Sequence, residues 1–377
     1  MEATGIICEY NPLHLGHKKQ MDMIRAAYPD GGIVCLMSGN YVQRGHPAII
    51  DKSLRARAAI SAGADLVLEL PVTASLSSAE GFAREGVRIL GGFCQRLCFG
   101  AESAGKESLL ATARLLLSPE FPDALHHELD KGLSFPVARQ SALQAMGLES
   151  DTLSLPNDIL ATEYCKAILE LGVAMEPMPI LRKGGYHDDT PDPENPSATA
   201  VRELMSSGED WLSYVPDDSC KGAVLHTLPS GEQAILSRLR TMTDSEFEAL
   251  PYGSEGLWRK LMHNARREAT LERIVEATKS KRYTRTRLDR MILCAYLGLT
   301  AADLSAPAPY TRVLAFNDRG RELLKSARQS GPFPNAGQQM DDPYQETELR
   351  TGRLYCQFAT RTEAPAQEDE RRVFYCK

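Results

Sequence analysis

The sequence predicts an α/β fold in which a parallel sheet is covered by helices on both faces, followed by a mainly helical C-terminal domain. Between residues 5 and 103, short apolar runs alternate with segments of helical periodicity. The apolar runs lack the polar alternation of a strand with one wet face, which is typical of buried parallel strands. From about residue 220, helical periodicity continues with few strand signals. We therefore expect a sheet domain over residues 1–210 and a mainly helical domain over 211–377, with a weakly ordered tail from 330.

The expected elements follow in order along the chain. The first strand is expected at 5–8, ahead of an Asn11-Pro12 turn and a helix that contains Leu15, Met21 and Ile24. Further strands are expected at 32–37, 65–70, 96–99 and 178–181. Further helices are expected at 52–62, 76–90, within 106–147, at 157–171, from 197 onward, and at 230–250, 254–278 and 284–299. Ligands of parallel sheets bind at the carboxyl ends of the strands. The polar residues expected there are Glu9, Asn11, Ser38, Asn40, Glu102 and Ser103.

The composition narrows the class of protein. The net charge of -7 argues against a protein that coats nucleic acid everywhere, although it leaves room for a local basic patch. No apolar run approaches the roughly 20 residues of a membrane span, and no secretory signal precedes the first strand. The nine cysteines are an odd number, and several fall inside expected strands or helices. This pattern favours reduced thiols in a cytoplasmic protein. Neither a membrane partner nor an obligate protein partner is expected.

Two histidines, His14 and His17, stand at the start of the first helix with Gly16 between them. Residues three apart share one face of a helix, so both imidazoles can point at one object. Because a helix start offers backbone N–H groups and a positive dipole end, the expected object is a phosphate. Such donors would stabilise the charge that builds up on an α-phosphate and on departing pyrophosphate. The alternatives are a pair of surface histidines or a zinc site. Zinc is disfavoured, since no cysteine pair is matched to these histidines.

A second helix start carries Ser197, Thr199 and Arg202. By itself it is an ordinary capped helix start. Beside the histidine pair, however, its hydroxyls and guanidinium could hold a triphosphate tail.

Residues 279–290 form the densest positive stretch of the chain. The stretch is either a solvated face or a nucleic-acid surface, because lysine, arginine, hydroxyl groups and one tyrosine are what phosphate and base contacts use. RNA is favoured over DNA, since no helix-turn-helix or zinc-finger pattern is present. The residues expected to bind are Lys279, Lys281, Arg282, Tyr283, Arg285, Arg287 and Arg290.

The two helix starts are similar to the His-x-x-His and Ser/Thr-x-x-Arg pair of the nucleotidyltransferase superfamily. More specifically, the chain resembles the bacterial tRNA(Met) cytidine acetate ligase family. The segments that carry this resemblance are EYNPLHLGH at 9–17, MSGNYVQRGHPAIIDK at 37–52, GADLVLELP at 63–71, FGAES at 99–103, LPND at 155–158, SATAVRELM at 197–205, SEGL at 254–257, KRYTRTRLDR at 281–290 and RVLAFNDRGRELL at 312–324. The chain departs from the family at Leu13 and Leu15, where the family more often has Phe and Asn.

The resemblance implies a Rossmann-like nucleotidyltransferase domain and an ATP-dependent ligase. Such an enzyme activates acetate as acetyl-adenylate and transfers the acetyl group to N4 of the wobble cytidine, position 34, of elongator tRNA(Met). The products are N4-acetylcytidine, AMP and pyrophosphate, and Mg²⁺ is expected with the nucleotide. With the second helix start included, the expected ATP-binding residues are Ile7, Cys8, Glu9, Tyr10, Asn11, Pro12, Leu13, His14, Leu15, Gly16, His17, Lys18, Lys19, Gln20, Gly100, Asn157, Arg182, Ser197, Thr199 and Arg202. His14 and His17 are the expected catalytic residues.

Two other functions stay open from the sequence. A small-molecule adenylyltransferase of cofactor biosynthesis would need the same first domain but no basic run. A non-catalytic nucleotide- and RNA-binding protein would bind ATP without turnover.

Overall fold

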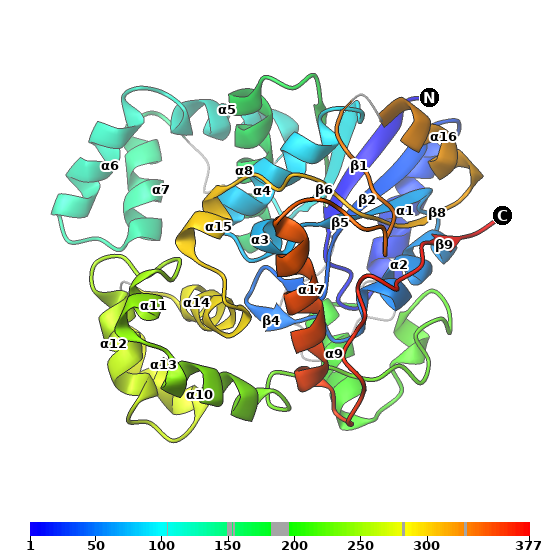
Figure 1. The fold of residues 1–377 in the computed structure, drawn as a ribbon. Coiled ribbons are helices and arrows are strands. Elements are labelled where there is room, and N and C mark those ends of the chain that lie inside the picture. The colour runs from blue at the N-terminus through cyan, green and yellow to red at the C-terminus, as the bar shows by residue number, and fades with distance from the viewer. Residues whose placement is uncertain (104, 149–152, 154, 182–195, 281–282, 328–329) are drawn as a thin grey trace.

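The computed structural model describes residues 1–103, 105–148, 153, 155–181, 196–280, 283–327 and 330–377. A sheet with helices on both faces makes up one part of the molecule, and the helices between residues 232 and 297 gather beside it (Figure 1). Helix α17 (Tyr344–Tyr355) lies between the two parts in this view.

The sheet has seven strands in the order β7-β6-β1-β2-β5-β8-β9. The five strands from β7 to β5 are parallel, β8 runs antiparallel to β5, and β9 runs parallel to β8. Their bounds are β1 (Ala3–Cys8), β2 (Gly32–Ser38), β5 (Leu66–Leu70), β6 (Arg96–Ala101), β7 (Glu176–Leu181), β8 (Val313–Phe316) and β9 (Phe374–Tyr375). The parallel sheet predicted from the apolar runs is confirmed, including a strand at the predicted position 178–181.

Both faces of the sheet are buried, which explains why its strands show no polar alternation. Neighbouring residues of β1 point to opposite sides, Ile6 into one apolar core and Ile7 into the other. Helices α1 (Leu15–Ala27) and α2 (Lys52–Ser61) contribute to the first core. The second core is covered by α4 (Ala79–Leu90), α5 (Lys106–Leu116), α8 (Pro156–Leu171) and α16 (Asp318–Ala327).

The helical part packs around a third core, in which α14 (Arg285–Leu297) is buried along most of its length. Two of the long helices predicted here are each divided in two. The predicted helix 230–250 is interrupted at Thr243. The side chains of Thr243 and Glu246 form a capping box there, which starts a new helix. Thr270 caps a new helix within 254–278 in the same way, by accepting from the N–H of Arg273. The resulting helices are α10 (Glu232–Thr241), α11 (Asp244–Glu248), α12 (Leu257–Ala265) and α13 (Leu271–Thr278).

The remaining elements connect these layers. They are β3 (Tyr41–Val42), β4 (His46–Pro47), α3 (Val72–Ser75), α6 (Phe121–Asp130), α7 (Phe135–Ala145), α9 (Ala198–Ser207), α15 (Ala301–Ser305) and two short 3-10 helices, η1 (Leu212–Tyr214) and η2 (Cys356–Phe358).

The C-terminal region differs from the sequence-based expectation. Strands β8 and β9 belong to the predicted helical domain 211–377 in sequence, but they extend the sheet of the first domain. The tail from 330, expected to be weakly ordered, contains α17 and β9 and contributes the buried Tyr355 and Phe358 to the helical core. The sheet layer therefore draws on both ends of the chain, and the boundary at residue 210 stays a prediction.

Candidate functional site

The histidine pair forms the N-terminal cap of α1. The Nδ1 atom of His14 accepts from the N–H of Gly16 (3.1 Å), and the N–H of His14 donates to Nδ1 of His17 (3.3 Å). The two imidazoles stack with their centroids 3.7 Å apart. Gly16 leaves room for this packing, because a Cβ there would lie 3.1 Å from the His14 ring, a tight contact.

These hydrogen bonds fix the chemistry that each ring offers. Because both Nδ1 atoms accept hydrogen bonds, each neutral imidazole carries its proton on Nε2, where it is a donor. The pair can therefore donate two hydrogen bonds from one helix face without either ring being charged.

The second predicted helix start lies against the first. Arg202 of α9 donates to the carbonyl of Asn11 (2.7 Å) and to the hydroxyl of Thr199 (2.9 Å). Ser197 caps α9 by accepting from the N–H of Ala200 (3.1 Å). A Cβ at Gly16 would lie 4.0 Å from the carbonyl oxygen of Pro196, so the N-termini of α1 and α9 are neighbours. The structure thus brings together two motifs that stand about 180 residues apart in the sequence.

The chain between β1 and α1 is held tightly. Tyr10 is buried and adopts φ 44°, a backbone conformation that bulky residues rarely take, and its hydroxyl lies 3.3 Å from the thiol of Cys35. The side-chain oxygen of Asn11 accepts from the N–H of Ile49 (2.7 Å). Leu13 is buried beside Tyr10 in the core under α1.

The other members of the predicted segment 7–20 have varied surroundings. Ile7 is buried in the core on the opposite face of the sheet, and the thiol of Cys8 points to the carbonyl of Leu36 (3.7 Å). Lys18 forms an ion pair with Asp22 (2.7 Å), and the amide of Gln20 donates to the thiol of Cys98 (3.4 Å). Pro12 is buried, Leu15 is half-buried and Lys19 is exposed.

Arg55 of α2 was missed by the sequence reasoning. Its guanidinium is fully buried and donates to the carbonyls of Glu9 (2.6 Å), Ser38 (3.1 Å) and Gly39, which ties together the carboxyl ends of β1 and β2. Arg55 is one of two arginines in the alanine-rich helix α2, and the sequence does not show which of the two is buried. Burial raises the pKa of the Glu9 carboxyl, partly offset by the N–H of Gln43 and by nearby arginines.

Asn157, an expected ATP-binding residue, lies beside the end of β6. Its amide donates to the carboxylate of Glu102 (2.5 Å). The neighbouring Asp158 is fully buried and accepts from the N–H groups of Glu102 (2.7 Å) and Ser103 (3.1 Å). Gly100 pairs with Ile180 of β7, at the edge of the sheet where the parallel strands end. Arg182 follows directly after β7 and lies outside the described residues.

The predicted basic run is partly engaged within the protein. Arg285 pairs with Glu272 (2.8 Å) and Asp289 (2.9 Å), and the hydrogen bond to Glu272 is the main cause of its raised pKa. Arg287 donates to the carbonyl of Tyr252 (2.7 Å), and Arg290 donates to the carbonyl of Gln43 (3.4 Å).

Other members of the run keep a more open position. Lys279 pairs with Glu276 at 3.6 Å, and the hydroxyl of Tyr283 donates to Glu255 (3.2 Å). Lys281 and Arg282 lie outside the described residues. The described part of the run is therefore neither a fully solvated face nor a row of cations without partners.

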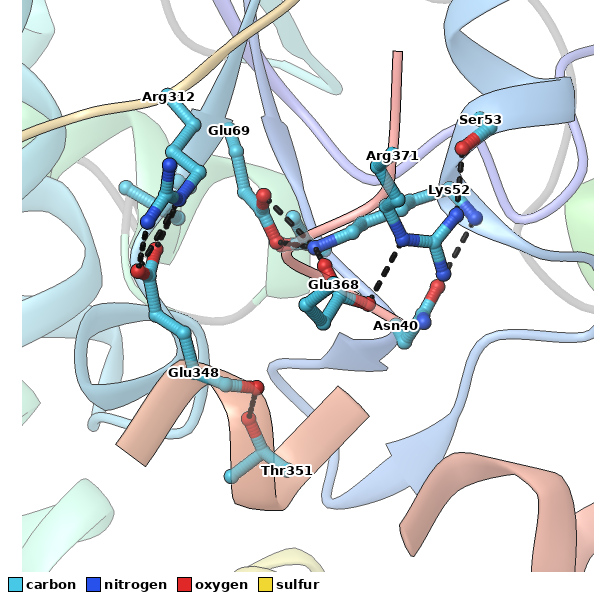
Figure 2. A network of polar contacts seen from close by, with 12 residues as sticks. Asn40, Lys52, Ser53, Glu69, Arg312, Glu348, Thr351, Glu368 and Arg371 are labelled. Atoms are coloured by element: carbon cyan, nitrogen blue, oxygen red, sulfur yellow. Dashed lines mark hydrogen bonds and ion pairs between the residues drawn. The ribbon is translucent and has the colours of Figure 1, made fainter. Parts of the chain in front are cut away.

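A buried polar network at the carboxyl edge of the sheet was also missed (Figure 2). Lys52, the first residue of α2, contacts Glu69 of β5 (2.6 Å) and Glu368 (2.7 Å). Arg371 contacts Glu368 (2.8 Å) and Asp51 (2.7 Å). Burial disfavours the charged form of Asp51, but Arg371 outweighs it and holds the pKa of that carboxyl well below its usual range.

This network fixes the C-terminal segment to the sheet. Beside it, Arg312 pairs with Glu348 of α17 (2.8 Å). The cavity that these groups enclose has a volume of about 20 Å³, which is room for a single water molecule. The network is therefore a structural anchor, and it is too full to hold a substrate.

Within the described residues, no group of three or more His, Cys, Asp or Glu side chains is arranged to hold a metal ion. All nine cysteines are free. None of the helices described is both long and apolar enough to cross a bilayer.

Comparison with known proteins places the chain in a family. The model of the HIGH nucleotidyl transferase family matches residues 1–371. A tRNA(Met) cytidine acetate ligase of Clostridium novyi is 36% identical over 361 residues, which cover 89% of each chain. A second, from Ligilactobacillus salivarius, is 34% identical over 374 residues, which cover 94% of this chain and 96% of the relative. The chain belongs to the tRNA(Met) cytidine acetate ligase family.

Solved structures agree with this family assignment. Thermotoga maritima TmcAL without ligand matches with a TM-score of 0.89, at 30% identity and over 100% of this chain and 99% of that one. The same protein bound with alpha-thio ATP matches with a TM-score of 0.87 over the same shares of the two chains. The predicted nucleotidyltransferase fold is confirmed by these similarities.

Proposed function

We propose that this protein uses ATP to activate acetate and transfers the acetyl group to N4 of the wobble cytidine, position 34, of elongator tRNA(Met). The observation that carries the proposal is the meeting of the two helix starts, where Arg202 bonds to Asn11 and Pro196 approaches Gly16. A pair of helix N-termini with two imidazole donors and one guanidinium suits a polyphosphate. The choice of acetate and tRNA(Met) as substrates follows the names of relatives that match over most of their length.

The proposed reaction has two steps. A carboxylate oxygen of acetate attacks the α-phosphorus of ATP, and the bond to the β-phosphate oxygen breaks to release pyrophosphate. The N4 amine of the cytidine then attacks the carbonyl carbon of acetyl-adenylate, AMP leaves, and the amine loses a proton. Neither step needs a covalent bond to the protein, so none of the nine free cysteines has a role as nucleophile.

Each part of the site has a proposed task in the first step. The Nε2–H groups of His14 and His17 would donate to phosphate oxygens as charge builds up on them. Ser197, Thr199 and Arg202 would hold the β- and γ-phosphates. Gly100, Asn157 and Arg182 are the further nucleotide contacts that we propose from the family resemblance.

We propose that Mg²⁺ arrives with the nucleotide. Mg²⁺ at nucleotide sites takes most of its ligands from phosphates and water, with one or two carboxylates from the protein. The site fits this mode, since Glu9 offers a carboxylate near Arg202 and no cage of three acidic or histidine ligands is found in the described part of the chain. The bound ion would neutralise charge on the phosphates, while the histidines and Arg202 act on the same oxygens.

The experiment that tests the proposal follows pyrophosphate. The protein is supplied with ATP and acetate, and exchange of labelled pyrophosphate into ATP is measured without tRNA. Acetylation is then measured with elongator tRNA(Met), initiator tRNA(Met) and an unrelated tRNA. We expect exchange without tRNA, and acetylation of the elongator tRNA alone.

Other outcomes identify other functions. Exchange that requires a phosphate-bearing cofactor precursor in place of acetate would indicate a small-molecule adenylyltransferase. Binding of ATP and RNA with no exchange under any condition would indicate a non-catalytic protein. Either result would refute the proposed function.

A further inference from the structure

The hairpin 41–47, formed by β3, β4 and the turn between them, lies between the nucleotide segment and the basic start of α14. On one side, the N–H of Gln43 donates to the carboxylate of Glu9 (2.7 Å). On the other side, the carbonyl of the same Gln43 accepts from Arg290 (3.4 Å). One residue of the hairpin is thus bonded to the segment after β1 and to α14.

The turn of the hairpin packs closely against the backbone of α14. Gly45 adopts φ 81°, and a Cβ added there would lie 2.4 Å from the backbone nitrogen of Arg290. Only glycine combines that backbone conformation with so close an approach. His46 of β4 lies 3.8 Å from Asp289 of α14. The turn is therefore held in a fixed position, with Arg44 exposed at its tip.

Three arginines lie near enough to His46 to affect its pKa, one in the hairpin itself and one in each of α9 and α14. Burial and the charges of Arg202, Arg285 and Arg44 together lower the pKa of His46 to about 4, so the ring is neutral at pH 7. Arg202 comes from the helix that faces the histidine pair, and Arg285 from the predicted RNA-binding run. Arg202 and Arg44 also act on the carboxyl of Glu9. Arginines therefore lie along a path from the helix starts, across the turn of the hairpin, to α14. The carboxylates of Glu9 and Asp289 lie beside this path, and Arg285 is paired with Asp289.

We propose that the hairpin 41–47 is an RNA-binding surface that leads the substrate strand from α14 to the nucleotide site, with Arg44 contacting a phosphate of the RNA. The proposal rests on the function proposed above. Arginine is the residue best suited to such a contact, because its planar fork can donate two hydrogen bonds to one phosphate. A held turn fixes where that contact is made, as positioning of a substrate backbone requires.

Arg290 takes a different role in this arrangement. Its guanidinium bonds to Gln43 and lies over the ring of Tyr252, at 5.0 Å from the centroid. The hydroxyl of Tyr252 in turn donates to the carbonyl of Leu76 (2.7 Å). Arg290 is thus a positioning residue that sets the hairpin against α14.

The test is Arg44→Ala in the full-length protein, with binding of elongator tRNA(Met) measured over a series of salt concentrations. We expect the dissociation constant to rise about ten- to a hundredfold, because one charge-assisted hydrogen bond is lost. The slope of log affinity against log salt should become shallower by about 1. Arg44→Lys should restore the slope because it keeps the charge. The matched control is Arg273→Ala, which removes an exposed arginine of α13 that pairs with Glu268 on the surface and should change neither quantity.

Two results would overturn the inference. If Arg44→Ala binds tRNA with unchanged affinity and slope, the hairpin is not an RNA surface. If Arg273→Ala changes the slope as much as Arg44→Ala, the effect comes from total charge and not from the hairpin. Exchange of pyrophosphate by the unsubstituted protein is measured alongside. Absence of this exchange would refute the proposed function. Failure of the proposed function can thus be told apart from failure of the hairpin inference.

Discussion

Replacing Arg202 by methionine separates two roles that the structure gives to one side chain. In the free protein, Arg202 bridges the two helix starts by donating to the carbonyl of Asn11 (2.7 Å) and to Thr199 (2.9 Å). The bond to Asn11 is partly buried, whereas the bond to Thr199 is exposed and adds little. The variant should therefore lose about 2 kcal/mol of unfolding free energy, the contribution of one hydrogen bond from a charged donor. Methionine keeps much of the length of the apolar stem but removes every donor.

The effect on activity should be larger than the effect on stability. If Arg202 holds the β- and γ-phosphates, its loss should lower the rate of pyrophosphate exchange by about 10² to 10³, which corresponds to about 3–4 kcal/mol at the transition state. Exchange is measured at saturating ATP and acetate, and stability by urea unfolding.

The control for this experiment is Arg240→Met. Arg240 is exposed in the helical part and also donates to backbone carbonyls, those of Glu268 and Ala269 (both 3.1 Å). We expect a small loss of stability and normal exchange. If Arg202→Met were destabilised but exchanged within threefold of the unsubstituted protein, Arg202 would be only a structural bridge, and the assignment of a phosphate clamp would be wrong.

The remaining predictions concern the histidine pair, the buried network and the basic run. His17→Ala should abolish pyrophosphate exchange and lower the unfolding free energy by only about 1 kcal/mol, the cost of losing a helix cap; near-normal exchange would contradict the phosphate role. Glu368→Gln should lower the unfolding free energy by about 3 kcal/mol, because Lys52 and Arg371 each lose a buried partner, whereas Glu322→Gln, which loses only a surface pair with Lys325, should cost less than 1 kcal/mol. The pKa values of Asp51 and Glu368 lie below their ordinary 3.8 and 4.5 in the folded protein. Their contribution to the unfolding free energy is therefore complete above about pH 4.5 and is lost as the pH falls through the lower native values. Urea midpoints that do not fall between pH 7 and pH 3 would contradict this contribution. Joint replacement of Lys281, Arg282 and Arg285 by alanine should weaken tRNA binding and make its salt dependence shallower. A loss of acetyl-adenylate formation with intact tRNA binding would contradict the assignment of this run to tRNA binding.

Much of the fold could be predicted because local sequence patterns encode it. The strands at the centre of the sheet are apolar on both faces, and this predicts a parallel sheet without any knowledge of the partners. The two helix starts were also visible locally, because caps and glycines act within one turn of a helix. Sequence periodicity did not reveal where the predicted helices 230–250 and 254–278 are interrupted. Thr243 and Thr270 mark these positions because each caps the N-terminus of a new helix.

The candidate site residues could be recognised from sequence alone, His14, Gly16 and His17 at one helix start and Ser197 to Arg202 at another. Their surroundings depend on tertiary packing. The bond from Arg202 to Asn11 and the ion pair of Lys52 with Glu368 join residues separated by 191 and 316 positions, and β8 and β9 return to the sheet from the far end of the chain. Tertiary packing also gives Arg285, Arg287 and Arg290 partners inside the protein. These three arginines are therefore part of the folded core's polar contacts as well as of a positive run. Such contacts depend on how the layers pack, and packing leaves no periodic signal in the sequence.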